Sequence, residues 1–219
     1  MINIFRILGD FSHLASIGIL IHTVATTIAI DGISLKTQVL YCLVFLTRYM
    51  DLLTLHWVSF YNTLMKLFFI GSSVYIVVLI QSFQKKNPIA YKEMVMNDTF
   101  NIKVLLGGAL FMSLILHHKF TVLELMWSFS VWLECVAILP QLFMLSKSGK
   151  AQSLTIHYIF ALGVYRFLYI FNWIWRYYSE GKWDRIAVLA GIIQTLLYSD
   201  FFYIYYRKVI RGGPFELPH

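Results

Sequence analysis

The chain has 219 residues, of which 59% are apolar and only 13% are charged. A soluble globular protein carries about 25% charged residues, so these few polar side chains cannot cover a water-facing surface, and the composition predicts an integral membrane protein. The net charge of +7 comes without a basic run or a base-stacking module, which argues against nucleic acid as a partner.

Long apolar stretches predict an all-α protein with seven transmembrane helices. A bilayer span needs about 20 apolar residues, and candidate stretches cover residues 8–29, 37–57, 60–82, 103–117, 121–145, 154–177 and 185–207, the fourth being short. The first stretch lacks a signal-peptide pattern, so we expect it to remain as an anchor. Pro140 predicts a kink within 121–145. We expect a transmembrane domain over 1–207 and a tail over 208–219.

The charges of the loops predict the orientation. If the C-terminus is cytosolic, ten Lys and Arg residues lie in cytosolic segments and five lie on the opposite side. Positive charge favours the cytosolic side of a membrane. We therefore expect a cytosolic C-terminus and an N-terminus on the other side.

A shift of the chain by 118 residues against itself suggests an internal repeat. The shift aligns Arg48 with Arg166 and Trp57 with Trp175, and it superposes the first three stretches on the last three. Such an alignment predicts two three-helix bundles, joined by the short fourth stretch as a linker helix, with a ligand site between them.

Charged residues lie inside the apolar stretches, where lipid would surround them: Arg48, Asp51, Lys66, Glu134, Arg166 and Asp200. A charge at the bilayer centre costs about 2.5–3.5 kcal/mol, so these side chains are expected to face one another or water. Arg48 and Asp51 are three residues apart, and a purely structural salt bridge between them is one interpretation. The other is that part of the set lines a polar cavity.

The non-cytosolic ends of the stretches add Arg6, Glu124 and Arg176. Arginines near aromatic residues often anchor a helix at the membrane interface. Together with Arg48, however, Arg6 and Arg176 would form a basic cavity that suits an anion of several charges. His13, inside the first stretch, has a plain interpretation as a buried residue that satisfies a hydrogen bond.

The sequence contains no motif of a known catalytic centre. HExxH, the P-loop, GxSxG and CxxC are all absent. Cys42 and Cys135, both inside apolar stretches, are expected to pack rather than form a disulfide or a metal site. We expect neither an enzyme nor a cofactor or metal.

Several motifs resemble one family: NIFR at 3–6, TRYMDL at 47–52, ECVAILPQLFML at 134–145, NWIWR at 172–176 and SDFFYIY at 199–205. Together they resemble the KDEL-type endoplasmic-reticulum (ER) retention receptors over nearly the whole chain. The resemblance implies a fold similar to PQ-loop and SWEET transporters, and the ER and cis-Golgi as compartments, with a lumenal N-terminus. It also implies a ligand, the C-terminal HDEL- or KDEL-type tetrapeptide of soluble ER proteins. Retrograde vesicles would return the bound proteins to the ER.

The resemblance also implies roles for individual residues. Arg48 would bind the terminal carboxylate of the peptide, supported by Tyr49 and Asp51. Arg6 and Arg176 would pair with the acidic side chains of the peptide, and Glu124 with its basic first residue. The remaining ligand-binding positions that the resemblance implies are Trp127, Tyr165, Arg166, Tyr169, Asn172 and Trp173.

A pH switch and a route back to the ER are implied in the same way. His13 would sense pH, and a hydrogen bond between Glu134 and Tyr165 would lock the bound state. Asp200 would be needed for cycling, with Lys208 and Arg211 toward the retrograde vesicle coat, COPI. The competing interpretation is a small-solute transporter of the SWEET or PQ-loop type, since intramembrane charges and a duplicated layout also suit alternating access.

Overall fold

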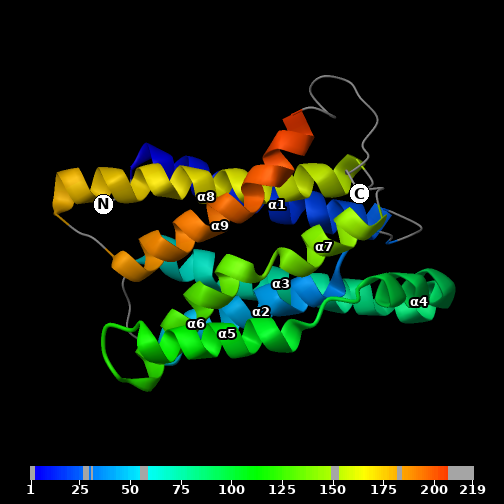
Figure 1. Ribbon diagram of the computed structural model, residues 1–219, viewed down its shortest axis with the longest axis horizontal. Helices are drawn as coiled ribbons and strands as arrows, with labels where there is room; N and C mark the ends of the chain where they lie inside the picture. Colours follow the sequence, from blue (N-terminus) through cyan, green and yellow to red (C-terminus); the bar gives the residue numbers. More distant parts are fainter. Residues whose placement is uncertain are drawn as a thin grey trace. The chain divides into compact units, whose positions relative to one another are not determined.

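The described part of the chain is helical and contains no strand. The computed structural model describes residues 3–26, 30, 32–54, 59–148, 153–181 and 184–206. Its elements are α1 (Ile4–Thr26), α2 (Leu35–Arg48), the 3₁₀ helix η1 (Met50–Thr54), α3 (Phe60–Lys86), α4 (Pro88–Asn97), α5 (Ile102–Ile115), α6 (Val122–Val136), α7 (Leu139–Ser148), α8 (Ser153–Glu180) and α9 (Arg185–Tyr205) (Figure 1). The prediction of an all-α fold is confirmed for these residues.

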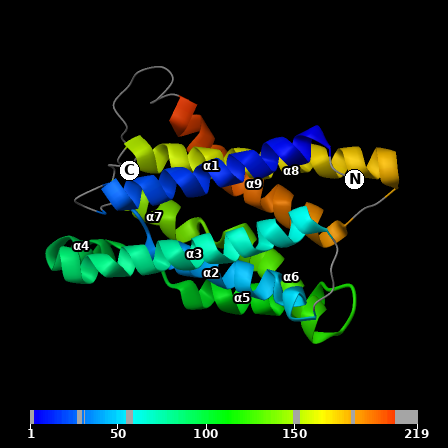
Figure 2. The same cartoon turned by 180° about the vertical axis from the view of Figure 1, so that it is seen from behind.

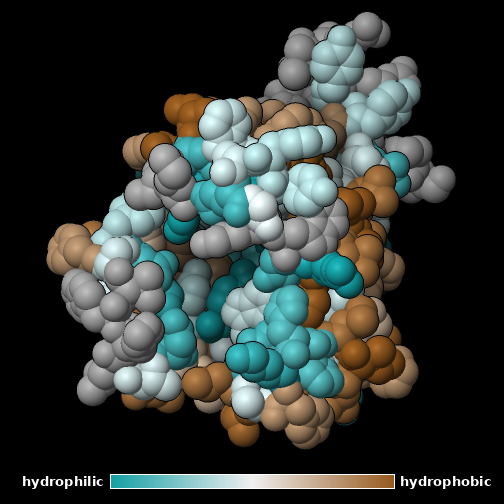
Figure 3. All heavy atoms as spheres, turned by 90° about the vertical axis from the view of Figure 1, so that its left-hand side faces the viewer, coloured by the Kyte–Doolittle hydropathy of each residue, from teal (hydrophilic) through white to brown (hydrophobic). Residues whose placement is uncertain are grey.

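Four helical segments are long and apolar enough to cross a membrane: α1, α3, the segment Val122–Lys147 and α9. A fifth would be α4 together with α5, which are bent by 55° at the break between them. Large apolar side chains such as Phe111 and Leu196 are exposed, and Figure 3 shows brown hydrophobic residues at the surface beside teal hydrophilic ones. In a membrane, the acyl chains of the lipids would surround such side chains. The count of seven spans stays a prediction.

The observed helices differ most from the predicted stretches at two places. The second stretch is helical only to Arg48, and the chain then forms η1, so Asp51 lies in a 3₁₀ turn rather than on the helix. The segment after α3 forms a short helix, α4, with Pro88 in its first turn and Asn87 as its N-cap. The apolar pattern did not predict α4 because half of its residues are polar or small.

Pro140 breaks the fifth stretch as predicted. Helix α6 ends at Val136 and α7 begins at Leu139, with Ala137 N donating to Glu134 O at 3.4 Å across the turn. Gln141, which follows Pro140, is fully buried, and its side chain bonds to backbone groups near the break. Its side chain accepts from Ser34 N at 2.8 Å and donates to Gly32 O at 2.6 Å, so it fastens the break to the start of α2.

Contacts divide the chain into two compact units, and each is described by itself. The first unit comprises Met1–Thr27 and Leu145–His219, and the second comprises Ile28–Met144. In the first, α1 lies along α8 and α8 packs on α9; in the second, α2 packs on α3 and α6, and α5 packs on α6 (Figure 2). The first unit joins α1 to the last helices, so the two predicted three-helix bundles stay a prediction.

A glycine lets the last two helices approach closely in the first unit. A Cβ on Gly163 of α8 would lie 2.5 Å from the Phe202 ring and 3.0 Å from the Tyr198 ring of α9. Contacts this short do not occur between real atoms, so any larger residue at position 163 forces the aromatic rings to move.

Gly163→Ala should therefore destabilise the protein by about 1–3 kcal/mol, the usual cost of overpacking. The measurement is the thermal melting of the purified protein in detergent. Gly18→Ala is the matched control, because a Cβ on Gly18 of α1 meets nothing within 4 Å. Equal melting temperatures of the two variants would contradict this packing.

Candidate functional site

A cavity of about 350 Å³ opens in the second unit, where α2 ends and α6 begins. Its lining residues come from α2, η1, α3, the turn before α6 and the first turns of α6: Thr47, Arg48, Tyr49, Met50, Asp51, Lys66, Thr121, Leu123, Glu124 and Trp127. The walls are mixed, with four charged side chains, two cationic and two carboxylate, beside aromatic and aliphatic ones. This mixture suits a ligand with both charged and apolar parts.

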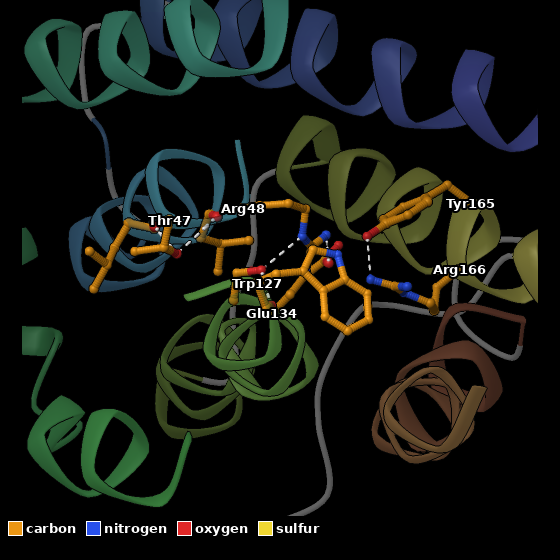
Figure 4. A network of polar contacts seen from close by, with 9 residues as sticks. Thr47, Arg48, Trp127, Glu134, Tyr165 and Arg166 are labelled. Carbon is orange, nitrogen blue, oxygen red and sulfur yellow. Dashed lines mark hydrogen bonds and ion pairs between the residues drawn. The ribbon is translucent and has the colours of Figure 1, made fainter. Parts of the chain in front are cut away.

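Arg48 closes one side of the cavity as the last residue of α2. Its Nε donates to Ser130 Oγ at 3.1 Å, and its Nη1 forms a hydrogen-bonded ion pair with Glu134 of α6 (Figure 4). Its Nη2 group is buried and has no hydrogen-bond partner among the residues that the structure describes. A buried cationic donor without a partner is costly, so this group favours an anion in the cavity.

Four of the six internal charges, Arg48, Asp51, Lys66 and Glu134, form ion pairs with one another. Arg166 instead bonds to the Tyr165 hydroxyl, and Asp200 is exposed. Glu134 is 2% exposed and neutralises Arg48. Asp51 forms an ion pair with Lys66 of α3, so the structural salt bridge between Arg48 and Asp51, which was one interpretation of their spacing, is not formed. The reason is geometric: α2 ends at Arg48, and the 3₁₀ turn carries Asp51 away from the helix face that a spacing of three residues implied.

Two carboxylate oxygens of the cavity also lack partners within the described ranges. They are Asp51 Oδ1 and Glu124 Oε1, both buried. Lys66 holds the other oxygen of Asp51 and lies 5.9 Å from the centroid of the Tyr49 ring. The cavity therefore presents a donor at Arg48 and acceptors at Asp51 and Glu124, a pattern that matches a ligand carrying both an acid and a hydrogen-bond donor or cation.

A second set of polar residues lies in the first unit, along the contact between α1 and α8. Spacings of three and four residues place Asn3, Arg6, Asp10 and His13 on one stripe of α1, and Tyr165, Tyr169, Asn172 and Arg176 on one stripe of α8. Asn3 Nδ2 donates to Asn172 Oδ1 at 2.7 Å, and the Tyr169 hydroxyl donates to Asp10 Oδ1 at 2.5 Å. The ring of His13 stacks on that of Tyr165, with centroids 4.2 Å apart.

The three arginines of this unit that belong to the predicted site each have an internal partner. Arg166 is 8% exposed, and its Nη2 donates to the Tyr165 hydroxyl at 2.9 Å (Figure 4). Arg6 Nε lies 3.8 Å from Asp10 Oδ2, and Arg176 Nε lies 3.3 Å from Glu180 Oε2, each one helical turn away. Arg6 and Arg176 are about one third exposed, so a ligand can reach both.

The predicted site residues thus fall into two groups. The cavity of the second unit gathers Arg48, Tyr49, Asp51, Glu124 and Trp127, with Glu134 behind Arg48. The first unit contains the others: Arg6, His13, Tyr165, Arg166, Tyr169, Asn172, Trp173 and Arg176. Asp200 is exposed on α9, whereas Lys208 and Arg211 lie outside the described residues.

The sequence analysis missed one buried acid in the first unit. Asp10 contacts Arg6 and Tyr169 but was not named as a site residue. Its position four residues after Arg6 in an apolar helix was a signal that could have identified it. Among the described His, Cys, Asp and Glu side chains, no cluster could hold a metal ion.

Comparisons with known proteins identify the family. The profile of the ER lumen protein retaining receptors matches residues 29–176. The chain is 69% identical over 217 residues to the ER lumen protein-retaining receptor of Saccharomyces cerevisiae, with 99% of both chains covered. It is 60% identical to that of Kluyveromyces lactis over the full length of both chains, and 50% identical to receptor 2 of Danio rerio over 99% of both. The chain therefore belongs to the family of ER lumen protein retaining receptors.

Proposed function

We propose that this receptor binds the C-terminal HDEL- or KDEL-type tetrapeptide of soluble ER proteins that have reached the Golgi, and returns them to the ER in retrograde vesicles. The names of its relatives state the retention of ER lumen proteins. The peptide and the cycle between compartments are the proposal, supported by the chemistry of the site.

The buried Nη2 group of Arg48 is the observation that carries the proposal. It lines a cavity of about 350 Å³ and lacks a partner among the described residues. A terminal carboxylate would satisfy it, with a charge-assisted hydrogen bond. Glu124 Oε1, in the same cavity, would accept from the basic first residue of the peptide. A neutral solute could hydrogen-bond to both groups, but without the charge assistance that a carboxylate and a cation supply.

Arg6 and Arg176 would then pair with the Glu and Asp side chains of the peptide. The two arginines are accessible, and each has a carboxylate one turn away that holds it in place. Tyr165, Arg166, Tyr169, Asn172 and Trp173 would complete the site. Hydrogen bonds to charged groups contribute about 1.5–3 kcal/mol each, so three or four of them outweigh the cost of ordering a tetrapeptide.

The membrane arrangement is part of the same proposal. Residues 1–207 would form seven spans in two three-helix bundles, joined by α5 in a SWEET-like fold, with the N-terminus in the lumen. Residues 208–219 would be a cytosolic tail, in which Lys208 and Arg211 contact COPI. The excess of Lys and Arg in the cytosolic segments supports this orientation.

His13 is the proposed pH sensor. It is buried, and its ring stacks on Tyr165, whose hydroxyl accepts from Arg166. Asp10 lies one turn before it on α1. An ordinary imidazole titrates near pH 6.5, between mildly acidic Golgi and near-neutral ER. A bound state that takes up a proton on His13, with Glu134 and Tyr165 closing alongside, binds more tightly at acidic pH.

Arg48→Lys should weaken binding of a free-acid HDEL peptide by at least tenfold, although the charge is kept. A lysine offers its donors from a single nitrogen, so it cannot reach Ser130, Glu134 and the peptide carboxylate from separate atoms, as the planar guanidinium can. The measurement is peptide affinity of the purified receptor, with C-terminally amidated HDEL as the control ligand. Equal affinity of the wild type for the acid and the amide would contradict the role of Arg48.

His13→Ala should reduce binding mainly at acidic pH and flatten the pH profile. When the complex holds one extra proton, affinity falls by up to about tenfold per pH unit as pH rises. The measurement is affinity between pH 5 and 8. His22→Ala is the control, because His22 is exposed on the same helix. If the His13→Ala receptor kept the wild-type pH profile of affinity, Glu134 and not His13 would be the pH sensor.

Asp200→Asn should leave peptide affinity within about twofold of wild type but stop the return of the receptor to the ER. Asp200 is exposed on α9 near the C-terminal end of the described chain. The measurements are peptide binding in vitro and receptor location in cells after cargo overexpression. Normal cycling combined with lost binding would refute this assignment.

A further inference from the structure

Among the described residues of the first unit, Asp10 is the one buried acid that the proposed site does not use. It lies in α1 and is 9% exposed. Its Oδ1 accepts a 2.5 Å hydrogen bond from the Tyr169 hydroxyl, and its Oδ2 lies 3.8 Å from Arg6 Nε. One carboxylate thus contacts two residues that the proposed function assigns to the peptide.

The neighbouring glycine makes this contact possible. A Cβ on Gly9 would lie 2.8 and 2.9 Å from ring carbons of Tyr169, so only glycine lets the ring lie against α1. With the ring in that place, the hydroxyl reaches the carboxylate of the next residue. Gly9 and Asp10 therefore fix the position and the direction of the Tyr169 side chain together.

The contact with Asp10 also decides which edge of Arg6 faces outward. The carboxylate approaches Nε, while the two Nη groups have no hydrogen-bond partner in the described part of the chain. The Arg6 side chain is 34% exposed and that of Asp10 only 12%, so the acid lies behind the guanidinium. A carboxylate from outside meets the paired Nη edge, which binds it in a bidentate way.

We propose that Asp10 is a positioning residue that sets the selectivity of the receptor for an acidic side chain of the peptide. It holds the Nε edge of Arg6, so that the Nη edge reads one carboxylate of the ligand. It also engages the Tyr169 proton, so that toward the peptide the tyrosine oxygen acts as an acceptor. This inference rests on the proposed function.

The test compares Asp10→Asn with the wild type in the full-length, purified receptor. Asparagine keeps the size of the side chain and an acceptor for Tyr169 but removes the charge that holds Arg6. The ligands are the peptides HDEL, HNEL and HDQL, in which each acid is exchanged for its amide in turn. Asp184→Asn is the control, because Asp184 caps α9 and asparagine is an equally good cap.

Asp10→Asn should weaken HDEL binding by about fivefold, the size of a partly exposed ion pair. It should leave the affinity for one of the two amide peptides unchanged, because the carboxylate that Arg6 reads is already missing there. A uniform loss for all three peptides, or no loss at all, would overturn the role of Asp10. The wild type tests the proposed function separately: if it binds HDEL strongly, the proposed function stands, and if it does not bind HDEL, the proposed function is refuted.

Asp10→Glu gives a second measurement that does not depend on the folding of the first variant. Glutamate keeps the charge, so the preference for HDEL over both amide peptides should remain, with melting close to that of the wild type. A glutamate variant that is folded but has lost this preference would overturn the proposal.

Discussion

The ion pair between Arg48 and Glu134 is the interaction on which the second unit depends. Glu134 is 2% exposed, and a charge in that place has neither water nor lipid headgroups to solvate it. Removal of one partner of such a pair costs about 3–5 kcal/mol, since the other charge is left buried alone. The pair therefore fixes α2 against α6, and it also determines which donors of Arg48 remain for a ligand.

The same constraint acts wherever a polar group lies within these helices. Lys66 neutralises Asp51, Asp10 engages Tyr169 and Arg6, and Gln141 satisfies the backbone where Pro140 interrupts the helix. In an apolar environment every one of these groups needs an internal partner. Polar atoms that the fold leaves unsatisfied are therefore candidates for ligand contact, and Arg48 Nη2, Asp51 Oδ1 and Glu124 Oε1 have no hydrogen-bond partner among the described residues.

The sequence predicted those features that follow from local chemistry. The predicted apolar stretches include the four segments that are long and apolar enough to cross a membrane, and Pro140 marked the break before α7. The cost of buried charge explains why Arg48, Asp51, Lys66 and Glu134 have ionic partners. The partners could not be predicted, because Arg48 and Glu134 are 86 residues apart and only the packing of α2 on α6 joins them. The end of α2 was missed because apolar residues continue through Leu52 and Leu53, although the chain leaves the helix there.

The shortness of α2 has a consequence for the surrounding lipid. Its 14 residues rise about 21 Å, whereas the hydrocarbon core of a bilayer is about 30 Å thick. In the seven-span arrangement that we propose, this hydrophobic mismatch is met by a thinner bilayer beside α2 or by water that enters at the Arg48 end. The ER membrane is a few ångströms thinner than the plasma membrane. In that arrangement, a helix as short as α2 would be accommodated at lower cost in a thinner membrane such as that of the ER.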